Sequence, residues 1–406
     1  MFSKKEGIYA DHSATTKVRD EVLQAMIPIL KEDFGNPSSI HQFGRKAKKH
    51  LEEARVNIAS VVNAKEEEIC FTSGDTESNN IVILGIEKMF NEGRYNNKRK
   101  HIISTKTEHP SVKEPLEYLE KRGWKITYLN CDSEGFINVE ELKSRIAHET
   151  ILVTIIHANN EIGTIQDLKN ISEICKEKNV LFHTDAVQSF GKIPINLREV
   201  NIDFMSMSAH KIYGPKGVGA LYIKDRERLT SIFIGGGQEN KIRPGTENLA
   251  GIVGFGVASK LIHEKIYENA KRLRELQINL MGDLLKNKDV IITGVQPAKV
   301  KENIPVEKFL YRLPGHVSIC VKNVEGENLV LQADLRGILS SSGSACSSGS
   351  LEPSHVLVAI SVSDEYVRGS LRLTLGRENT LDEVNYIISS VEETIKTLSK
   401  KTAQVH

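Results

Sequence analysis

The chain has 406 residues, of which 39% are hydrophobic and 26% are charged, so it has enough apolar surface for a large core, and its length indicates two domains. Lysine and arginine (54) nearly balance aspartate and glutamate (53), and the net charge of +1 excludes a whole-chain field that would attract nucleic acid or an anionic membrane. The N-terminal sequence MFSKKEGIYADHSATT lacks the apolar segment of a secretory signal, and no later stretch approaches the roughly 18 apolar residues of a membrane span. A soluble, cytoplasmic protein is expected.

Residues 50 to 225 alternate apolar runs of strand length with amphipathic helical stretches. The predicted strands are 66–72, 101–107, 125–131, 151–158, 180–186, 202–209 and 218–224. The predicted helices between them are 51–62, 78–90, 110–123 and 170–179. Strands that alternate with helices predict an α/β fold with a mostly parallel sheet covered on both faces.

A second block follows the Gly-rich turn GGGQENKIRPGT. A long helical stretch from about residue 247 to 287 leads into it, strands are predicted at 316–323 and 370–376, and a helix at 381–401 closes the chain. The pattern predicts a large domain of residues 15–258 and a smaller α+β domain made of residues 1–14 and 259–406.

Polar residues interrupt the apolar strands near their ends: Thr72, Ser73, Gly74, His109, Asn159, Asn160, Asp185, Gln188, Ser208, Ala209, His210 and Lys211. In an open α/β sheet the carboxyl ends of the strands line the ligand crevice, so these groups are expected to converge. Their convergence indicates a site without naming its ligand.

Lys211 follows a strand of buried type, and the Gly/Pro-rich turn after it leaves its amine facing the crevice. Such a lysine can form a Schiff base, and pyridoxal-phosphate (PLP) enzymes pair it with an acid on the pyridinium nitrogen, a role that suits Asp185. Taken singly, Lys211 can be an exposed loop lysine and Asp185 can be the cap of the next helix. Ser208 and His210 beside the lysine favour the cofactor site.

The segment FTSGDTESNN places Ser73 and Gly74 between a predicted strand and a predicted helix. Free backbone N–H groups and the positive helix end can hold a phosphate there, with the Thr76 hydroxyl as a further donor. An ordinary N-cap explains the same residues equally well.

Sequence blocks along nearly the whole chain carry a family likeness: YADHSATT, NPSSIHQFGR, FTSGDTESNN, TEHPSV, NNEIGTIQ, HTDAVQ, SMSAHKIYGPKGVG, GGGQE with RPGT, RLPGHVS, SSGSACSSGSLEPSHVL and SLRLTLGREN. In these blocks the chain resembles the cysteine desulfurases of the NifS/IscS type, within the class V aminotransferase superfamily. The resemblance implies the aspartate aminotransferase-like fold of PLP enzymes (fold type I). It also implies conversion of L-cysteine to L-alanine, with the sulfur passed to an enzyme thiol.

The resemblance implies a role for each matching residue. Lys211 would form the Schiff base, Asp185 would hold the pyridine nitrogen, and His109 would stack on the ring and assist proton transfers. The other cofactor contacts implied are Asn160 and Gln188 near the ring hydroxyl, and Gly74, Asp75, Thr76, Ser208 and His210 around the phosphate.

Two further implied contacts concern the partner subunit and the substrate. Thr246 would reach the neighbouring subunit's cofactor, so a homodimer is expected. Asn36 and Arg372 would hold the substrate carboxylate, for which the guanidinium fork is well shaped.

The five cysteines are odd in number, scattered and without a C-x-x-C pair, so neither a disulfide framework nor a resident metal is expected. Cys346 lies in SSSGSACSSGS, whose small polar residues cannot pack and predict a mobile loop at 340–350. By resemblance Cys346 receives the sulfur as a persulfide and hands it to an acceptor such as an iron–sulfur scaffold, where it would be a transient cluster ligand. The other four lie in apolar or helical contexts typical of buried structural thiols: Cys70, Cys131, Cys175 and Cys320.

Two positions depart from the family pattern. Asp75 stands where alanine is usual and puts an anion near the expected phosphate, unless it turns away as a helix cap. Asn240 and Lys241 replace the usual Arg-Gly pair. Either departure can alter PLP binding or the subunit contact.

Four other functions are alternatives to a cysteine desulfurase. A selenocysteine lyase or a class V aminotransferase would use the same cofactor site, although an aminotransferase needs no thiol in a Ser/Gly loop. A catalytically inactive sulfur-transfer scaffold is the non-enzyme alternative, against which Lys211, His109, Asp185 and Cys346 all argue. A nucleotide-binding oxidoreductase is disfavoured because no G-x-G-x-x-G follows the first strand.

Overall fold

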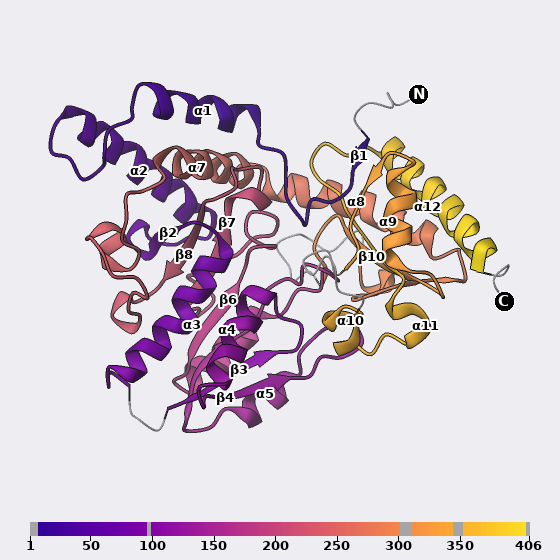
Figure 1. Cartoon of the computed structure of the whole chain (residues 1–406), viewed down its shortest axis with the longest axis horizontal. Helices are drawn as coiled ribbons and strands as arrows, with labels where there is room; N and C mark the ends of the chain where they lie inside the picture. The colour runs from indigo at the N-terminus through magenta and orange to yellow at the C-terminus, as the bar shows by residue number, and fades with distance from the viewer. Residues whose placement is uncertain (1–6, 96–98, 301–310, 344–351, 403–406) are drawn as a thin grey trace.

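The computed structural model describes residues 7–95, 99–300, 311–343 and 352–402 (Figure 1). Seven strands form its main sheet, in the order β2-β8-β7-β6-β5-β3-β4. Their bounds are β2 Ile69–Thr72, β3 His101–Thr105, β4 Lys125–Leu129, β5 Thr150–Thr154, β6 Leu181–Asp185, β7 Phe204–Ser208 and β8 Gly219–Ile223. β8 runs antiparallel to β2 and β7, and all other pairs of neighbouring strands are parallel, so the predicted mostly parallel sheet is confirmed.

Helices cover both faces of this sheet. They are α1 Asp20–Lys31, α2 Gln42–Val61, α3 Asp75–Asn91, α4 Pro110–Glu120, α5 Val139–Arg145, α6 Leu168–Glu177 and α7 Leu249–His263. Successive strand residues serve opposite faces: Leu181 packs in the core with α3 and α4, and Phe182 packs in the core with α2, α6 and α7. Because both faces are buried, the strands read as continuous apolar runs.

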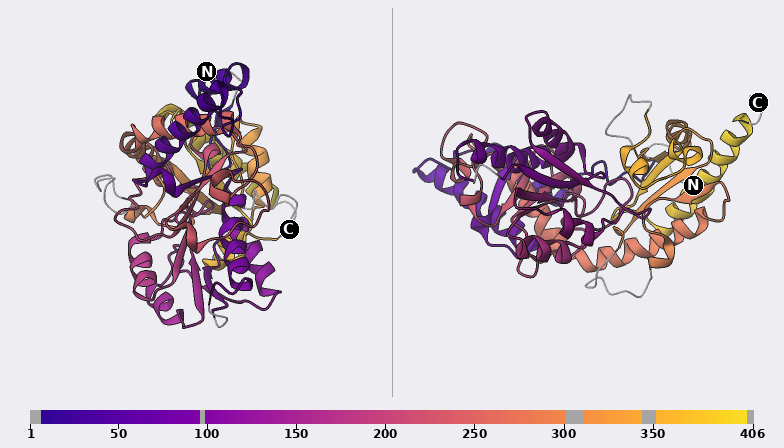
Figure 2. Two further views of the ribbon diagram at one scale, coloured as in Figure 1. Left: turned by 90° about the vertical axis from the view of Figure 1, so that its left-hand side faces the viewer. Right: turned by 90° about the horizontal axis from the view of Figure 1, so that it is seen from below.

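A smaller unit completes the molecule. Its antiparallel sheet has the order β12-β10-β9, formed by β9 Val290–Ile292, β10 His316–Val321 and β12 Ser370–Thr374. The helices of this unit are α8 Ile266–Leu284, α9 Gly326–Asp334, α10 His355–Ala359, α11 Asp364–Val367 and α12 Leu381–Thr402. Figure 2 shows this unit beside the large sheet, joined to it by α8. The helical stretch expected at 247–287 is therefore two consecutive helices, α7 and α8.

The start of the chain belongs to both units. Strand β1 Ile8–Tyr9 pairs in parallel with β11 Ile338–Leu339 of the small unit. The next residues pass to the large unit, where the N–H of Thr16 donates to the carbonyl of His210 at 2.9 Å. This segment therefore lies across the junction at which the candidate site is found.

In the described part of the chain, no helix combines the length and the apolar character needed to cross a membrane.

Candidate active site

A pocket with a cavity volume of about 130 Å³ lies at the carboxyl ends of β5, β6 and β7, against the first segment of the chain. It is called the cofactor pocket below. The predicted residues that line it are Asp75, His109, Asn160, Asp185, Gln188, Lys211 and Arg372. The others are Ser13, Ala14, Ile156 and Val187. Residues far apart in the sequence thus converge as expected for strand ends of an open α/β sheet.

Lys211 ends the short 3-10 helix Ala209–Lys211, which directly follows β7. Its Nζ donates to the carbonyls of Ser13 at 2.6 Å and Ala14 at 2.8 Å. These two carbonyls hold the amine at the wall of the cofactor pocket. They were missed from the sequence because backbone groups carry no residue-type signal, although the block YADHSATT contains them.

Asp185 is the last residue of β6 and is buried. Its carboxylate accepts from the N–H of Val187 at 3.0 Å and from Nδ2 of Asn79 at 2.9 Å. Burial raises the pKa of Asp185 above its usual value, despite these hydrogen bonds. The nearby charge of His109 offsets the effect of burial only in part, so a cation brought by a ligand would be stabilised here.

His109 caps α4, and its Nδ1 accepts from the N–H of Ser111 at 3.2 Å. The hydroxyl of Ser111 lies 2.7 Å from the same nitrogen and accepts from Nδ2 of Asn79 at 2.8 Å. Because Nδ1 accepts from the N–H of Ser111, the serine hydroxyl can act as its second donor, and in this arrangement a neutral His109 carries its proton on Nε2. Asn79 and Ser111 were not singled out from the sequence, since hydroxyl and amide side chains on helices usually serve as caps.

The N-terminus of α3 provides a place for an anion. Its N-cap, Gly74, has no side chain to bond the first-turn N–H groups, and nothing lies within 4 Å of where a Cβ would be. Such a terminus with open space in front of it suits a phosphate. Glu77 is occupied elsewhere, because it accepts from the N–H of Ser73 at 2.9 Å and from Nε of Arg243 at 2.8 Å.

Ser208, Thr76 and His210 do not line the cofactor pocket themselves. Ser208 is buried at the end of β7, and Nδ1 of His210 lies 3.1 Å from Oγ1 of Thr15. Asp75 does line it, at the first position of α3.

Arg372 on β12 reaches the cofactor pocket from the small unit and is only 2% exposed. It donates through Nη2 to Asp11 at 2.9 Å and through Nη1 to the carbonyl of Asn160 at 3.0 Å. Its buried Nε has no acceptor within the described residues. An unsatisfied guanidinium N–H in a closed pocket fits a carboxylate ligand.

Three predicted residues stand apart from the cofactor pocket. Asn36 is exposed between α1 and α2, where its Oδ1 accepts from the N–H of Ser38 at 2.8 Å. Thr246 is exposed in the turn before α7. Cys346 and part of its predicted loop lie outside the described residues.

The four described cysteines are unsuited to nucleophilic chemistry. Cys70, Cys175 and Cys320 are buried, and Cys131 is half-buried. Burial raises the pKa of Cys131 to about 11 and that of Cys320 to about 12, and it raises the pKa of the other two thiols as well. Within the described residues, no three His, Cys, Asp or Glu side chains are grouped so as to hold a metal ion.

A model of the family described as aminotransferase class-V matches residues 8–387. The chain therefore belongs to the class V aminotransferase family, whose members depend on PLP.

Individual proteins and solved structures are also similar to this chain. Cysteine desulfurase IscS of Dictyoglomus turgidum is 47% identical over 395 residues, which cover 97% of this chain and 96% of that protein. The structure of a NifS-like protein is similar with a TM-score of 0.86 and 36% identity, and the match covers 97% of this chain and 100% of that one. The structure of SspA in complex with cysteine has a TM-score of 0.77 and 33% identity, with 92% and 99% covered.

The residues of the cofactor pocket fit PLP. Asp185, buried without a cation, can hold the protonated ring nitrogen, and the open N-terminus of α3 can hold the phosphate. Lys211 can bind the aldehyde carbon through Nζ. When bound, PLP withdraws electrons from the α-carbon of an amino-acid substrate. Asp75 is the one lining residue that opposes this fit, because its charge repels a phosphate.

Proposed function

We propose that this chain is a PLP-dependent cysteine desulfurase, which takes sulfur from L-cysteine and leaves L-alanine. The convergence of Lys211, Asp185 and Arg372 in one pocket carries the proposal, since an amine, a buried acid and a carboxylate-binding guanidinium are the groups that an amino-acid-processing PLP enzyme needs. The near full-length similarity to IscS desulfurases and to a protein solved with cysteine supports the choice of substrate.

Each side chain has a separate task in this proposal. Lys211 anchors the cofactor, Asp185 binds its ring nitrogen, and the first turn of α3 binds its phosphate with Thr76, Ser208 and His210 close by. Arg372 orients the substrate through its carboxylate. His109, with Nδ1 engaged by Ser111, exchanges protons at Nε2.

Cys346 receives the sulfur. Its thiolate attacks the sulfur of the substrate, the substrate C–S bond breaks, and the electron pair of that bond stays on carbon, which then takes up a proton. The products are L-alanine and a persulfide on Cys346. The raised pKa values of the four described thiols support this assignment, since none of them supplies a thiolate near neutral pH.

The large domain comprises residues 15–258, and the small domain comprises residues 1–14 and 259–406.

The active form is a homodimer. Exposed apolar side chains support the dimer: Leu30, Phe34 and Ile40 near α1 and α2, and Phe233 and Ile234 before α7. Ile40 is 90% exposed and Ile234 is 97% exposed, which is typical of a surface covered by a partner. Thr246, exposed in the same stretch as Ile234, then serves the partner's cofactor pocket.

The enzyme works in the cytoplasm and passes its persulfide sulfur to an acceptor protein such as an iron–sulfur scaffold. The names of its IscS relatives and the absence of a membrane-crossing helix from the described residues support this setting.

Replacement of Cys346 by serine tests the reaction. Cys346→Ser should bind PLP and L-cysteine as the wild type does, yet form neither alanine nor sulfide, because a serine hydroxyl does not attack sulfur as a thiolate does. Alanine, sulfide and the keto acid that an aminotransferase would release are measured together. Cys131→Ser is the matched control and should keep full activity. Unchanged alanine formation by Cys346→Ser, or keto-acid formation by the wild type, would overturn the proposed reaction.

A further inference from the structure

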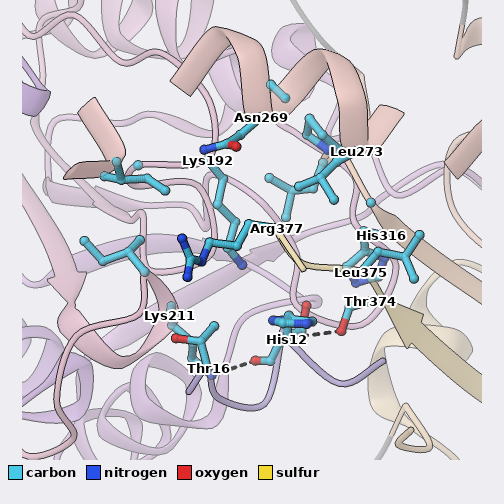
Figure 3. A pocket seen from close by; sticks show the side chains of 18 of the residues that line it. His12, Thr16, Lys192, Lys211, Asn269, Leu273, His316, Thr374, Leu375 and Arg377 are labelled. Carbon is cyan, nitrogen blue, oxygen red and sulfur yellow. Dashed lines mark hydrogen bonds between the residues drawn. The ribbon is translucent and has the colours of Figure 1, made fainter. Parts of the chain in front are cut away.

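A second pocket, called the rear pocket, adjoins the cofactor pocket and has a cavity volume of about 40 Å³ (Figure 3). The two pockets share Ser13 and Lys211, but Asp185, His109 and Arg372 do not line the rear pocket. The rear pocket lies at the junction of the two units, because its lining includes Asn269 of α8 and Thr374 of β12 from the small unit, and Lys211 and Ile262 from the large unit. Its polar lining is His12, Ser13, Thr16, Lys192, Lys211, Tyr213, Asn269, His316, Thr374 and Arg377.

The lining of the rear pocket is cationic. It contains Lys192 and Arg377, together with Lys211, whose amine binds the cofactor when PLP is present, and no aspartate or glutamate among its described residues; Nε of Arg377 pairs with Glu378 outside this lining at 2.6 Å. Figure 3 shows Lys192 and Arg377 in the middle of the view, below Asn269 of α8. Burial, with the nearby charge of Lys211, lowers the pKa of Lys192 to about 7. The ammonium form of Lys192 therefore has too little negative charge around it to stabilise it. An anion in the rear pocket would supply the missing charge.

One side of the rear pocket is apolar. Ile212, Ile262, Leu273, Leu313 and Leu375 line it together with Ala270 and Pro314. A hydrated inorganic anion would leave these side chains without contacts, whereas a carboxylate with a short alkyl chain matches both the charge and the apolar wall.

We propose that the rear pocket binds a short-chain organic acid, with its carboxylate at Lys192 and Arg377 and its alkyl chain against Leu273 and Leu375. This site is separate from the proposed desulfurase reaction and does not depend on it.

A chain of hydrogen bonds connects the rear pocket to the cofactor lysine. Nζ of Lys192 donates to Oε1 of Gln188 at 3.0 Å, and Nε2 of Gln188 donates to the carbonyl of Ser13 at 2.9 Å. That carbonyl also accepts from Lys211 at 2.6 Å. A carboxylate that draws Lys192 from Gln188 therefore changes the surroundings of Lys211, so binding should alter the absorption spectrum of bound PLP.

The test uses butyrate as the probe and butyramide, which has the same shape without the charge, as its control. Calorimetric titration of the purified enzyme with its PLP bound should give one butyrate per chain and no binding of butyramide. Lys192→Met should weaken butyrate binding by about tenfold or more, the loss expected for a hydrogen bond to a charged group. Lys260→Met, which removes an exposed lysine from α7, should leave it unchanged.

Arg377→Met provides a second route to the same answer and should also weaken butyrate binding by about tenfold. If Lys192→Met does not fold, Arg377→Met alone tests whether butyrate binds in the rear pocket. Butyrate could instead occupy the cofactor pocket at Arg372. Affinity that is lost in Arg372→Met but kept in Lys192→Met and Arg377→Met would show this and overturn the proposal. Equal binding of butyramide, or no binding of butyrate to the wild type, would overturn it too.

Discussion

The side-chain amide of Asn79 donates to the buried carboxylate of Asp185 across 2.9 Å. Its second N–H reaches the hydroxyl of Ser111, which lies beside Nδ1 of His109. One amide therefore fixes both the acid at the bottom of the cofactor pocket and the imidazole at its side. Neither contact requires the cofactor to be present, so the two groups are positioned before it binds.

Replacing this amide by an acid should weaken PLP binding. Asn79→Asp puts a second carboxylate beside Asp185, which raises the pKa of Asp185 further and favours its protonated form. A protonated Asp185 cannot pair with a charged ring nitrogen, so the dissociation constant for PLP, followed by protein fluorescence, should rise by about tenfold or more. Asn170→Asp, an exposed change on α6, is the control. Unaltered PLP binding by Asn79→Asp would show that Asp185 does not hold the ring nitrogen.

Removing the hydroxyl that engages His109 should slow turnover. In Ser111→Ala, Nδ1 of His109 loses its O–H donor, and the preference for a proton on Nε2 weakens. We expect kcat to fall by about tenfold with little change in KM, and the pH profile of kcat to shift, because a proton-transfer group is less well poised. Ser111→Thr should restore both. Ser104→Ala removes another buried hydroxyl, one without a partner among the described residues, and should change neither kcat nor its pH profile. An unshifted pH profile for Ser111→Ala would contradict the role given to Ser111.

Mixing inactive subunits tests whether two chains share a site. Lys211→Ala cannot bind PLP covalently, and Thr246→Ala should be impaired because Thr246 is proposed to serve the partner. A mixed dimer contains one pocket with both residues intact, so the mixture should recover activity up to about a quarter of the wild-type value after random exchange of subunits. Exchange is confirmed by mass spectrometry under native conditions. Complete exchange without recovery would count against a shared site.

Acid should destabilise the large sheet through its buried histidines. His183 on β6 is buried between Thr154 and Ser206, and burial lowers its pKa to about 3. Because the folded pKa lies below the unfolded value of about 6.5, the stabilisation is complete above that pH and is lost as the pH falls toward 3. At pH 5 the loss from this one side chain is about 2 kcal/mol.

His183→Gln should therefore show a smaller fall in the free energy of unfolding between pH 7 and pH 5, by about 2 kcal/mol, measured by urea denaturation. His148→Gln, which changes an exposed histidine, should fall as the wild type does. The same fall in all three proteins would mean that His183 does not resist protonation in the folded state.

Lys241 has a left-handed backbone, with φ at 67°, and follows Glu239 and Asn240 with φ at 46° and 54°. A side chain costs about 1 kcal/mol in this conformation, so Lys241→Gly should be more stable than Lys241→Ala by about that amount. At Lys49, which is exposed within α2, the order should reverse, with alanine the more stable. Chemical denaturation of the four variants measures both differences. Alanine as stable as glycine at position 241 would refute the left-handed conformation.

The sheet and much of the cofactor pocket could be predicted because strand periodicity places residues such as Asp185 and Lys211 at the ends of buried strands. Other parts of the site could not be predicted. Ser13 and Ala14 act through their carbonyls, and Lys211 is nearly 200 residues away from them, so residue type gives no hint of the contact. The rear pocket depends on how α8 packs against the large unit, which periodicity does not determine.

Asn36 and Thr246 show a second limit. Both were assigned to the site by resemblance, yet neither lines the cofactor pocket of the single chain. The resemblance gives a residue its role without saying which subunit's pocket it serves, and a site completed by a partner can be assembled only after the dimer contact is known.

The pairing of β1 with β11 affects the order in which the protein folds during its synthesis on the ribosome. Ala10 bonds to Leu339 and Thr374, and Asp11 bonds to Arg372, so these residues find their partners only when the C-terminal part of this sequence has been made. The seven-stranded sheet, complete at Ile223, can form well before that. Closure of the cofactor pocket by Ser13, Ala14 and Arg372 is therefore among the last events of synthesis, and a truncated nascent chain cannot hold PLP as the finished enzyme does.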